Sequence, residues 1–241
     1  ALTPAQRQQV EEIKEKINLM DSGYALQFGS TAQKDMAAFS DSLLSQVRTK
    51  DSGQVGELLT DLAGKINDFS ESQNDSFVKK IPLIGSLVNK GENMLSSYEK
   101  LSTKVAKIQS ELEKAKTNMM KDIVLFDNLY QKNLAYFKEL QLYIQAGEEK
   151  LTEMRNQVLP KLRMDAANST DPMAAQVVSD FESNVDRFEK KIYDLELSRT
   201  IAVQTAPQIK MIQNNDRVLV DKIQTAVLNT IPVWKSQFVI A

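Results

Sequence analysis

Apolar residues along this chain recur at helical spacing, and in the middle of the chain the repeat is long and regular. From Leu95 the apolar positions advance in alternating steps of three and four residues, the heptad repeat of a coiled coil. The repeat includes Tyr98, Leu101, Val105, Ile108, Leu112, Ala115 and Met119, and it continues with stutter-like phase shifts to Val158. The pattern predicts one helix over residues 94–159, interrupted only at Gly147.

A second long repeat follows a clear loop at residues 165–171. Asp171 is a good N-cap, and Pro172 suits the first helical turn. The repeat then steps by four and three through Phe181, Val185, Phe188, Ile192 and Leu195. It predicts a helix that ends near Thr230. We expect Pro207 to kink this helix, because proline removes one backbone hydrogen bond.

The first part of the chain predicts shorter helices. Thr3 and Pro4 mark the start of the first helix, and two further amphipathic helices with short connections follow. Residues 70–76 are uniformly polar and are predicted to be a loop.

Two long apolar seams joined by a short loop must fold back on each other. The predicted fold is all-α and elongated. It is a long antiparallel coiled-coil hairpin over residues 77–241, with its tip at 165–171. The shorter helices of residues 1–76 pack on the hairpin, and we expect the whole to be one structural unit.

The composition excludes several classes of enzyme. The 241 residues include no Cys and no His, so thiol nucleophiles, the Ser-His-Asp triad and zinc sites with Cys or His ligands are absent. The sequence has no phosphate loop, dinucleotide fingerprint or nucleophile elbow. We therefore expect no enzymatic activity, no cofactor and no metal.

Charge is unevenly distributed although the net charge is only −2. Residues 1–78 carry a net charge of −5, whereas residues 79–121 carry nine Lys against four Glu. The basic stretch has no Arg, the better ligand for phosphates and base edges, so we expect no nucleic-acid partner. A solvated helix face is the commoner meaning of such a stretch.

No apolar run approaches the ~20 residues that span a bilayer. The most apolar segment, residues 81–88, favours a connector docked on the core. A membrane-dipping tongue, as in helical pore-formers, is the alternative. We expect no transmembrane segment, and peripheral membrane association remains open.

The seam of the second long helix turns polar after Leu195. Arg199 and Asp216 occupy seam positions. Folding the hairpin about its tip places Arg199 opposite residues 132–140, where Asn133, Tyr136 and Glu139 could pair with it. This pattern indicates either a register-setting polar layer or a surface for a ligand or partner at the proline. The candidate surface comprises Arg199, Gln204, Pro207, Gln208, Gln213, Asn214 and Asn133.

Carboxylates near the hairpin tip are a weaker candidate. Glu148, Glu149 and Glu153 could bind a hard cation, but alternating charge on a solvated helix is far commoner. Trp234 is expected in the core or in an interface.

The string YDLELSRTIAVQTAPQIKMIQNN at residues 193–215 resembles the signature of the TelA (KlaA) toxic-anion-resistance family. Residues 39–51, 142–147 and 231–237 support the resemblance, which covers nearly the whole chain. It implies a bacterial, cytoplasmic protein associated with resistance to tellurite, with no accepted active site to carry over. Members of the family extend further, so we expect this chain to be a fragment with both ends trimmed.

Two functions fit these observations. The first is a non-enzymatic helical scaffold that acts through protein partners, such as tellurium-resistance or envelope-stress components, in the cytoplasm or at the membrane through those partners. The alternative is direct binding of a toxic oxyanion by a site of Lys, Arg and Gln. Reduction of tellurite needs thiols or a redox cofactor, for which the sequence offers no residue or motif.

Overall fold

We describe residues 2–48, 52–78 and 87–240 of a computed structural model. Within these residues the chain is helical and contains no strand, so the all-α prediction is confirmed. The elements are α1 (Pro4–Glu15), α2 (Tyr24–Gln27), α3 (Ser30–Arg48), α4 (Ser52–Val78), α5 (Leu87–Glu153), the π-helical turn η1 (Met154–Val158), α6 (Leu159–Ala167), α7 (Ala174–Thr225), the π-helical turn η2 (Ala226–Thr230) and α8 (Ile231–Ile240).

The first helix begins where the sequence predicts it. The Thr3 hydroxyl accepts a hydrogen bond from the Gln6 backbone amide, and the Gln6 side chain accepts one from the Thr3 amide. This reciprocal capping box satisfies amides that the first helical turn leaves without partners. Pro4 follows at a position where its missing N–H costs nothing.

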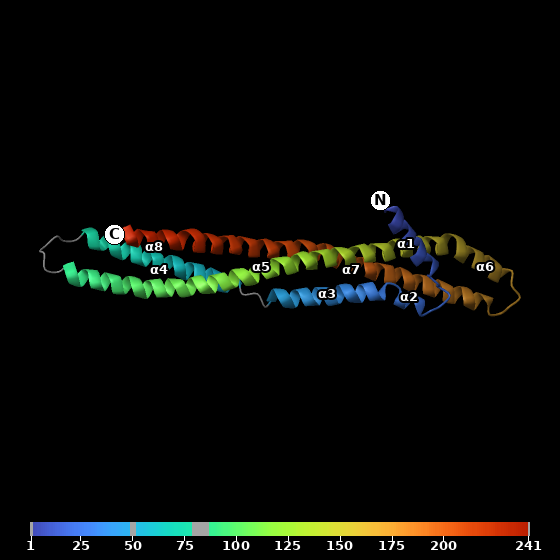
Figure 1. The fold of residues 1–241 in the computed structure, drawn as a ribbon. Coiled ribbons are helices and arrows are strands. Elements are labelled where there is room, and N and C mark those ends of the chain that lie inside the picture. Colours follow the sequence, from blue (N-terminus) through green and yellow to red (C-terminus); the bar gives the residue numbers. More distant parts are fainter. Residues whose placement is uncertain (1, 49–51, 79–86, 241) are drawn as a thin grey trace. The chain divides into compact units, whose positions relative to one another are not determined.

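The two predicted long helices are present and antiparallel. α6 and α7 meet at a short exposed loop, and α5 and α7 run in opposite directions (Figure 1). Asp171 accepts a hydrogen bond from the Met173 amide at 2.8 Å, as a residue that starts a helix should. The α-helix itself starts two residues later than Pro172, at Ala174.

Two predicted breaks are wrong. Residues 70–76, expected as a loop, continue α4 to Val78. The segment has neither Pro nor Gly, so nothing in it interrupts a helix that is already growing. Both interpretations of residues 81–88, the docked connector and the membrane-dipping tongue, fall largely outside the described residues.

The helix predicted to end at Leu159 instead continues past Pro160 through a π-helical turn. In η1 the Leu159 amide donates to the Met154 carbonyl, and in η2 the Ile231 amide donates to the Ala226 carbonyl. Pro160 and Pro232 each follow such a turn closely. The wider turn relieves the clash between a proline ring and the carbonyl four residues earlier. α7, in contrast, passes through Pro207 as an α-helix.

The described helices form two compact units. Unit 1 combines residues 1–48 with 128–210, and unit 2 combines residues 49–127 with 211–241. The long helices α5 and α7 contribute to both units. The predicted division of the chain at residue 76 remains a prediction.

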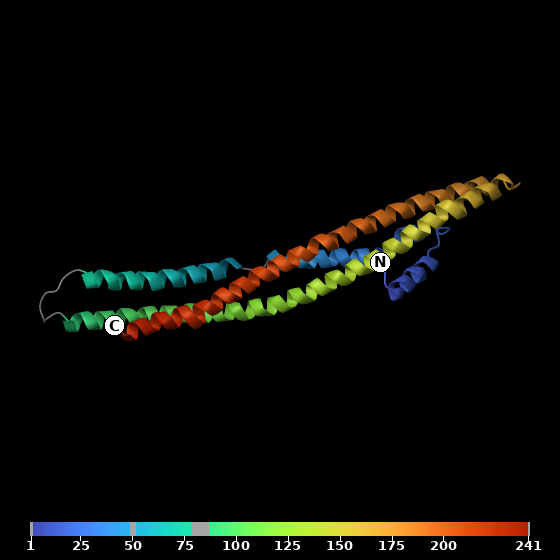
Figure 2. The same cartoon turned by 90° about the horizontal axis from the view of Figure 1, so that it is seen from above.

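Each unit has its own apolar core. In unit 1 the Phe28 and Phe188 rings meet edge to face with centroids 4.9 Å apart, and Met36 and Leu140 are fully buried. In unit 2, α4, the first part of α5 and α8 lie side by side (Figure 2). Trp234 is buried there and stacks on Tyr98, as the prediction of a core or interface position requires.

Candidate functional site

Arg199 lies in unit 1 on α7 and is half-buried between the arms of the hairpin. Its Nη1 donates to Gln141 Oε1 at 3.1 Å, so the prediction that Asn133, Tyr136 or Glu139 would pair with it is wrong. Gln141 lies just beyond the expected range of residues 132–140, within reach of a long arginine side chain.

Asn133 contributes to the same layer in a different way. Its side chain is buried, and its Nδ2 donates to the Ala202 carbonyl at 2.8 Å. Its Oδ1 has no hydrogen-bond partner within the described parts of the chain. Ser198 and Thr205 are also buried, and their hydroxyls bond to carbonyls of α7 itself. This arrangement is typical of a polar layer that fixes hairpin register.

The other predicted residues divide sharply by burial. Gln204, Pro207, Gln208 and Asn214 are exposed. Gln213 is completely buried in unit 2, where its Nε2 donates to the Ile123 carbonyl at 2.9 Å. Gln213 therefore cannot belong to an exposed docking surface.

The structure reveals an apolar face that the sequence reasoning missed. Tyr193, Leu197 and Ile201 follow one another at intervals of four on α7 and are 60%, 50% and 41% exposed. Gln204 and Gln208 continue the same side of the helix. We call these five residues the outer face of α7. Their helical spacing is visible in the sequence, but the inner seam of the same helix has the longer and more regular apolar repeat.

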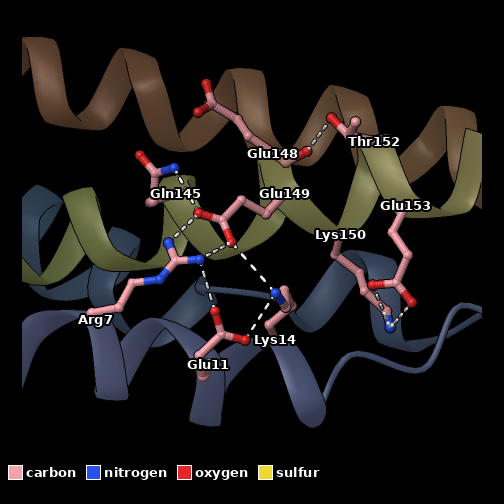
Figure 3. A network of polar contacts seen from close by, with 9 residues as sticks. All are labelled: Arg7, Glu11, Lys14, Gln145, Glu148, Glu149, Lys150, Thr152 and Glu153. Carbon is pink, nitrogen blue, oxygen red and sulfur yellow. Dashed lines mark hydrogen bonds and ion pairs between the residues drawn. The ribbon is translucent and has the colours of Figure 1, made fainter. Parts of the chain in front are cut away.

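Of the candidate carboxylates near the tip, Glu149 takes part in ion pairs between helices, whereas Glu153 pairs with Lys150 of its own helix (Figure 3). Glu149 on α5 receives both terminal nitrogens of Arg7 from α1, at 2.5 and 3.0 Å, and Lys14 Nζ lies 3.4 Å away. Glu11 lies 2.8 Å from each of these two cations. This fork geometry is the strong form of a carboxylate–guanidinium contact.

These contacts change the chemistry of Glu149. The hydrogen bond from Arg7 is the main reason why the pKa of the Glu149 carboxyl falls to about 2, and the Gln145 amide contributes in the same direction. The hydrogen bond to Glu149 in turn raises the pKa of the Arg7 guanidinium. Glu149 is thus held as a carboxylate by fixed cations. No group of three acidic residues in the described part of the chain is arranged to hold a metal ion.

Other cations of unit 1 are also neutralised by carboxylates. Arg155 donates to both oxygens of Glu189, at 2.8 and 2.6 Å, and Arg163 pairs with Glu182. An oxyanion would have to displace these carboxylates. The tip of the hairpin is therefore a poor site for capturing one.

Comparison with known proteins identifies the family. A family profile described as "Toxic anion resistance protein (TelA)" matches residues 10–241. The chain belongs to the TelA toxic anion resistance family. It is 41% identical over 244 residues to TelA-like proteins of Staphylococcus aureus strains bovine RF122 / ET3-1 and Mu50, and 40% identical to that of strain COL. All of this chain is covered in each case, and it spans 64% of the length of these relatives. No solved structure matches the chain.

Family membership confirms the resemblance drawn from residues 193–215. The outer face of α7 and Arg199 both lie within that string. Neither the family description nor the helical fold indicates catalysis. Among the described residues, no helix has the length and apolar character needed to cross a bilayer.

Proposed function

We propose that this chain is a non-enzymatic scaffold in resistance to toxic anions such as tellurite, and that it acts in the cytoplasm by binding protein partners. The observation that carries the proposal is the outer face of α7. Three large apolar side chains are exposed there in one line, within the string that resembles the family signature. Contiguous exposed apolar residues mark interaction sites on soluble surfaces.

The spacing of the outer face suits one kind of partner. Residues 193, 197, 201, 204 and 208 advance by four, four, three and four, which is the spacing of helix-to-helix contacts. Gln204 and Gln208 add hydrogen-bonding groups without net charge. An amphipathic helix of a partner protein, with an apolar line and few charges at its centre, would cover this face.

Direct binding of an oxyanion remains the second candidate because of Arg199. This guanidinium is half-buried, and its hydrogen bond goes to a neutral amide rather than to a carboxylate. A cation with a neutral partner keeps charge available for an anion. One side chain is nevertheless a sparse site, since a tightly held oxyanion needs several converging donors.

Matched variants separate the two functions. Replacing Leu197 and Ile201 with Asn should abolish the resistance that the full-length protein confers on cells, while circular dichroism and thermal unfolding remain close to the parent. Leu44→Asn is the control, because Leu44 is 54% exposed in unit 1 on another helix. Equal resistance in all three strains would contradict a docking role for the outer face.

Calorimetry with purified protein tests the second candidate. We expect no tellurite binding at micromolar concentrations. Tight stoichiometric binding that is lost in Arg199→Gln would replace the scaffold proposal with direct anion capture.

A further inference from the structure

Four lysines repeat every seven residues along α5 in unit 2: Lys100, Lys107, Lys114 and Lys121. All four side chains are exposed. We call them the basic line. They lie in the stretch of residues 79–121 whose positive charge has no role in the proposed function.

The basic line is straight because it shares the period of the buried seam. Val105, Leu112 and Met119 are buried at the same seven-residue interval, and each lies five positions after one lysine of the line and two positions before the next. A seven-residue repeat keeps one side of a supercoiled helix facing one direction. Successive lysines are therefore ~10.5 Å apart, and the line is ~32 Å long.

The lysines are not neutralised by nearby carboxylates. Within the described part of the chain, no ion pair includes any of the four. Lys104 lies on the same side of the helix, and Glu111 is the one carboxylate between the lysines on that side. Glu99 and Glu113 occupy the opposite flank of the heptad. The side of α5 that carries the line is strongly positive.

The positions between the lysines are small and polar. Thr103, Ser110 and Thr117 also repeat every seven residues and are exposed. The Thr103 and Thr117 hydroxyls donate to carbonyls of their own helix. The line therefore offers neither an apolar anchor nor an aromatic side chain, the groups that dominate protein–protein hot spots and membrane insertion.

We infer that the basic line docks unit 2 on an anionic membrane surface, by attraction to lipid headgroups and without insertion. Lysine is a flexible point charge that suits mobile headgroups, and a straight line of charge can meet a flat surface along its whole length. The phosphate rows of a nucleic-acid duplex wind away from a straight line, so a duplex is the less favoured partner. The inference does not depend on the proposed function.

Vesicle co-sedimentation of the whole chain tests the inference. The probe is a vesicle of phosphatidylcholine and phosphatidylglycerol, with pure phosphatidylcholine vesicles and a duplex DNA as separate arms. One variant replaces all four lysines of the line with Gln. The control variant makes the same change at four other exposed lysines, namely Lys138, Lys161, Lys190 and Lys222. Both variants lose equal charge, and circular dichroism verifies that both remain helical.

We expect the parent to bind only the anionic vesicles and to be released at high salt. Loss of the line should weaken binding on the order of a hundredfold, since each lysine near an anionic surface contributes a severalfold factor. The control should bind within a few fold of the parent. Three results would overturn the inference: no vesicle binding by the parent, equal loss in both variants, or loss of DNA binding alone. None of these measurements involves tellurite resistance, so they fail or succeed separately from the scaffold proposal.

Discussion

Gly147 is a position at which the absence of a side chain lets helices approach closely. A Cβ added there would lie 2.9 Å from Ile192 Cγ1 and 3.2 Å from the Phe28 ring. The sequence shows Gly147 only as an interruption of an apolar repeat. In the structure it is buried inside an uninterrupted α5, beneath a side chain of α7. Glycine is present because of this contact and not because of a break in the helix.

A pair of glycine substitutions tests this explanation. Gly147→Ala should destabilise the protein by about 1–2 kcal/mol, because overpacking a buried site outweighs the gain in helix propensity. Gly64→Ala should stabilise it by about 0.5–1 kcal/mol, because its added methyl meets nothing within 4 Å in the interior of α4. Urea unfolding of both variants measures the difference. Effects of the same sign would contradict the close approach at Gly147.

At the scale of single elements, α1 is attached to α5 by the ion pairs of Glu149. Val10 of α1 is fully buried, but much of the rest of the helix is polar and exposed. The contacts of Arg7 and Lys14 with Glu149 therefore carry a large part of the specificity of this attachment. Exposed ion pairs are individually weak, so the fork geometry and the shared carboxylate matter more than the number of pairs.

The pKa of Glu149 predicts how this attachment depends on pH. The folded-state pKa is about 2, against an ordinary value of 4.5, so the stabilisation is fully present above pH 4.5 and is lost as pH falls through about 2. After allowance for solvent screening, Glu149→Gln should cost about 1 kcal/mol at neutral pH and almost nothing near pH 2.

Unfolding curves at several pH values measure this difference, and amide exchange in α1 shows whether the helix is released. Glu15→Gln is the control, because it removes a negative charge from α1 at a residue outside the ion pairs of Glu149. A cost for Glu149→Gln that does not change with pH would show that the side chain acts by packing instead of by charge.

At the scale of the whole molecule, residues far apart in the chain hold the hairpin together. Arg155 pairs with Glu189, Asn133 bonds to Ala202, and Gln213 bonds to Ile123. The connection between α6 and α7, at residues 168–173, is exposed. We therefore expect its covalent continuity to be dispensable once the arms have paired.

Cleavage of this connection tests that conclusion. A site for a specific protease inserted between Ser169 and Thr170 should be cut readily in the folded protein, because exposed loop tips are favoured sites. The two fragments should then elute together in gel filtration and retain the helical signal of the intact protein. Separation of the fragments without denaturant would contradict a hairpin held by its side chains.

The sequence by itself determined the elements and the family. Heptad spacing identified Val105 and Leu112 as buried, and Thr3 with Pro4 identified the first helix start. These features are local, because they depend only on residues within a few turns of one another. The sequence is therefore enough to identify them. The resemblance of residues 193–215 to the TelA family signature also needed only the sequence, and the family comparison confirmed it.

Only the tertiary structure decided how these elements meet. Gln213 and Gln208 look alike in the sequence, yet one is buried beneath α5 and the other is exposed. Leu195 and Leu197 are both apolar, yet one fills the core and the other lies on the outer face of α7. Arg199 bonds to Gln141, 58 positions earlier in the chain, and only the packing of α7 on α5 brings the two side chains together. Periodicity defines the faces of a helix, but contacts between residues distant in the chain determine which face is covered.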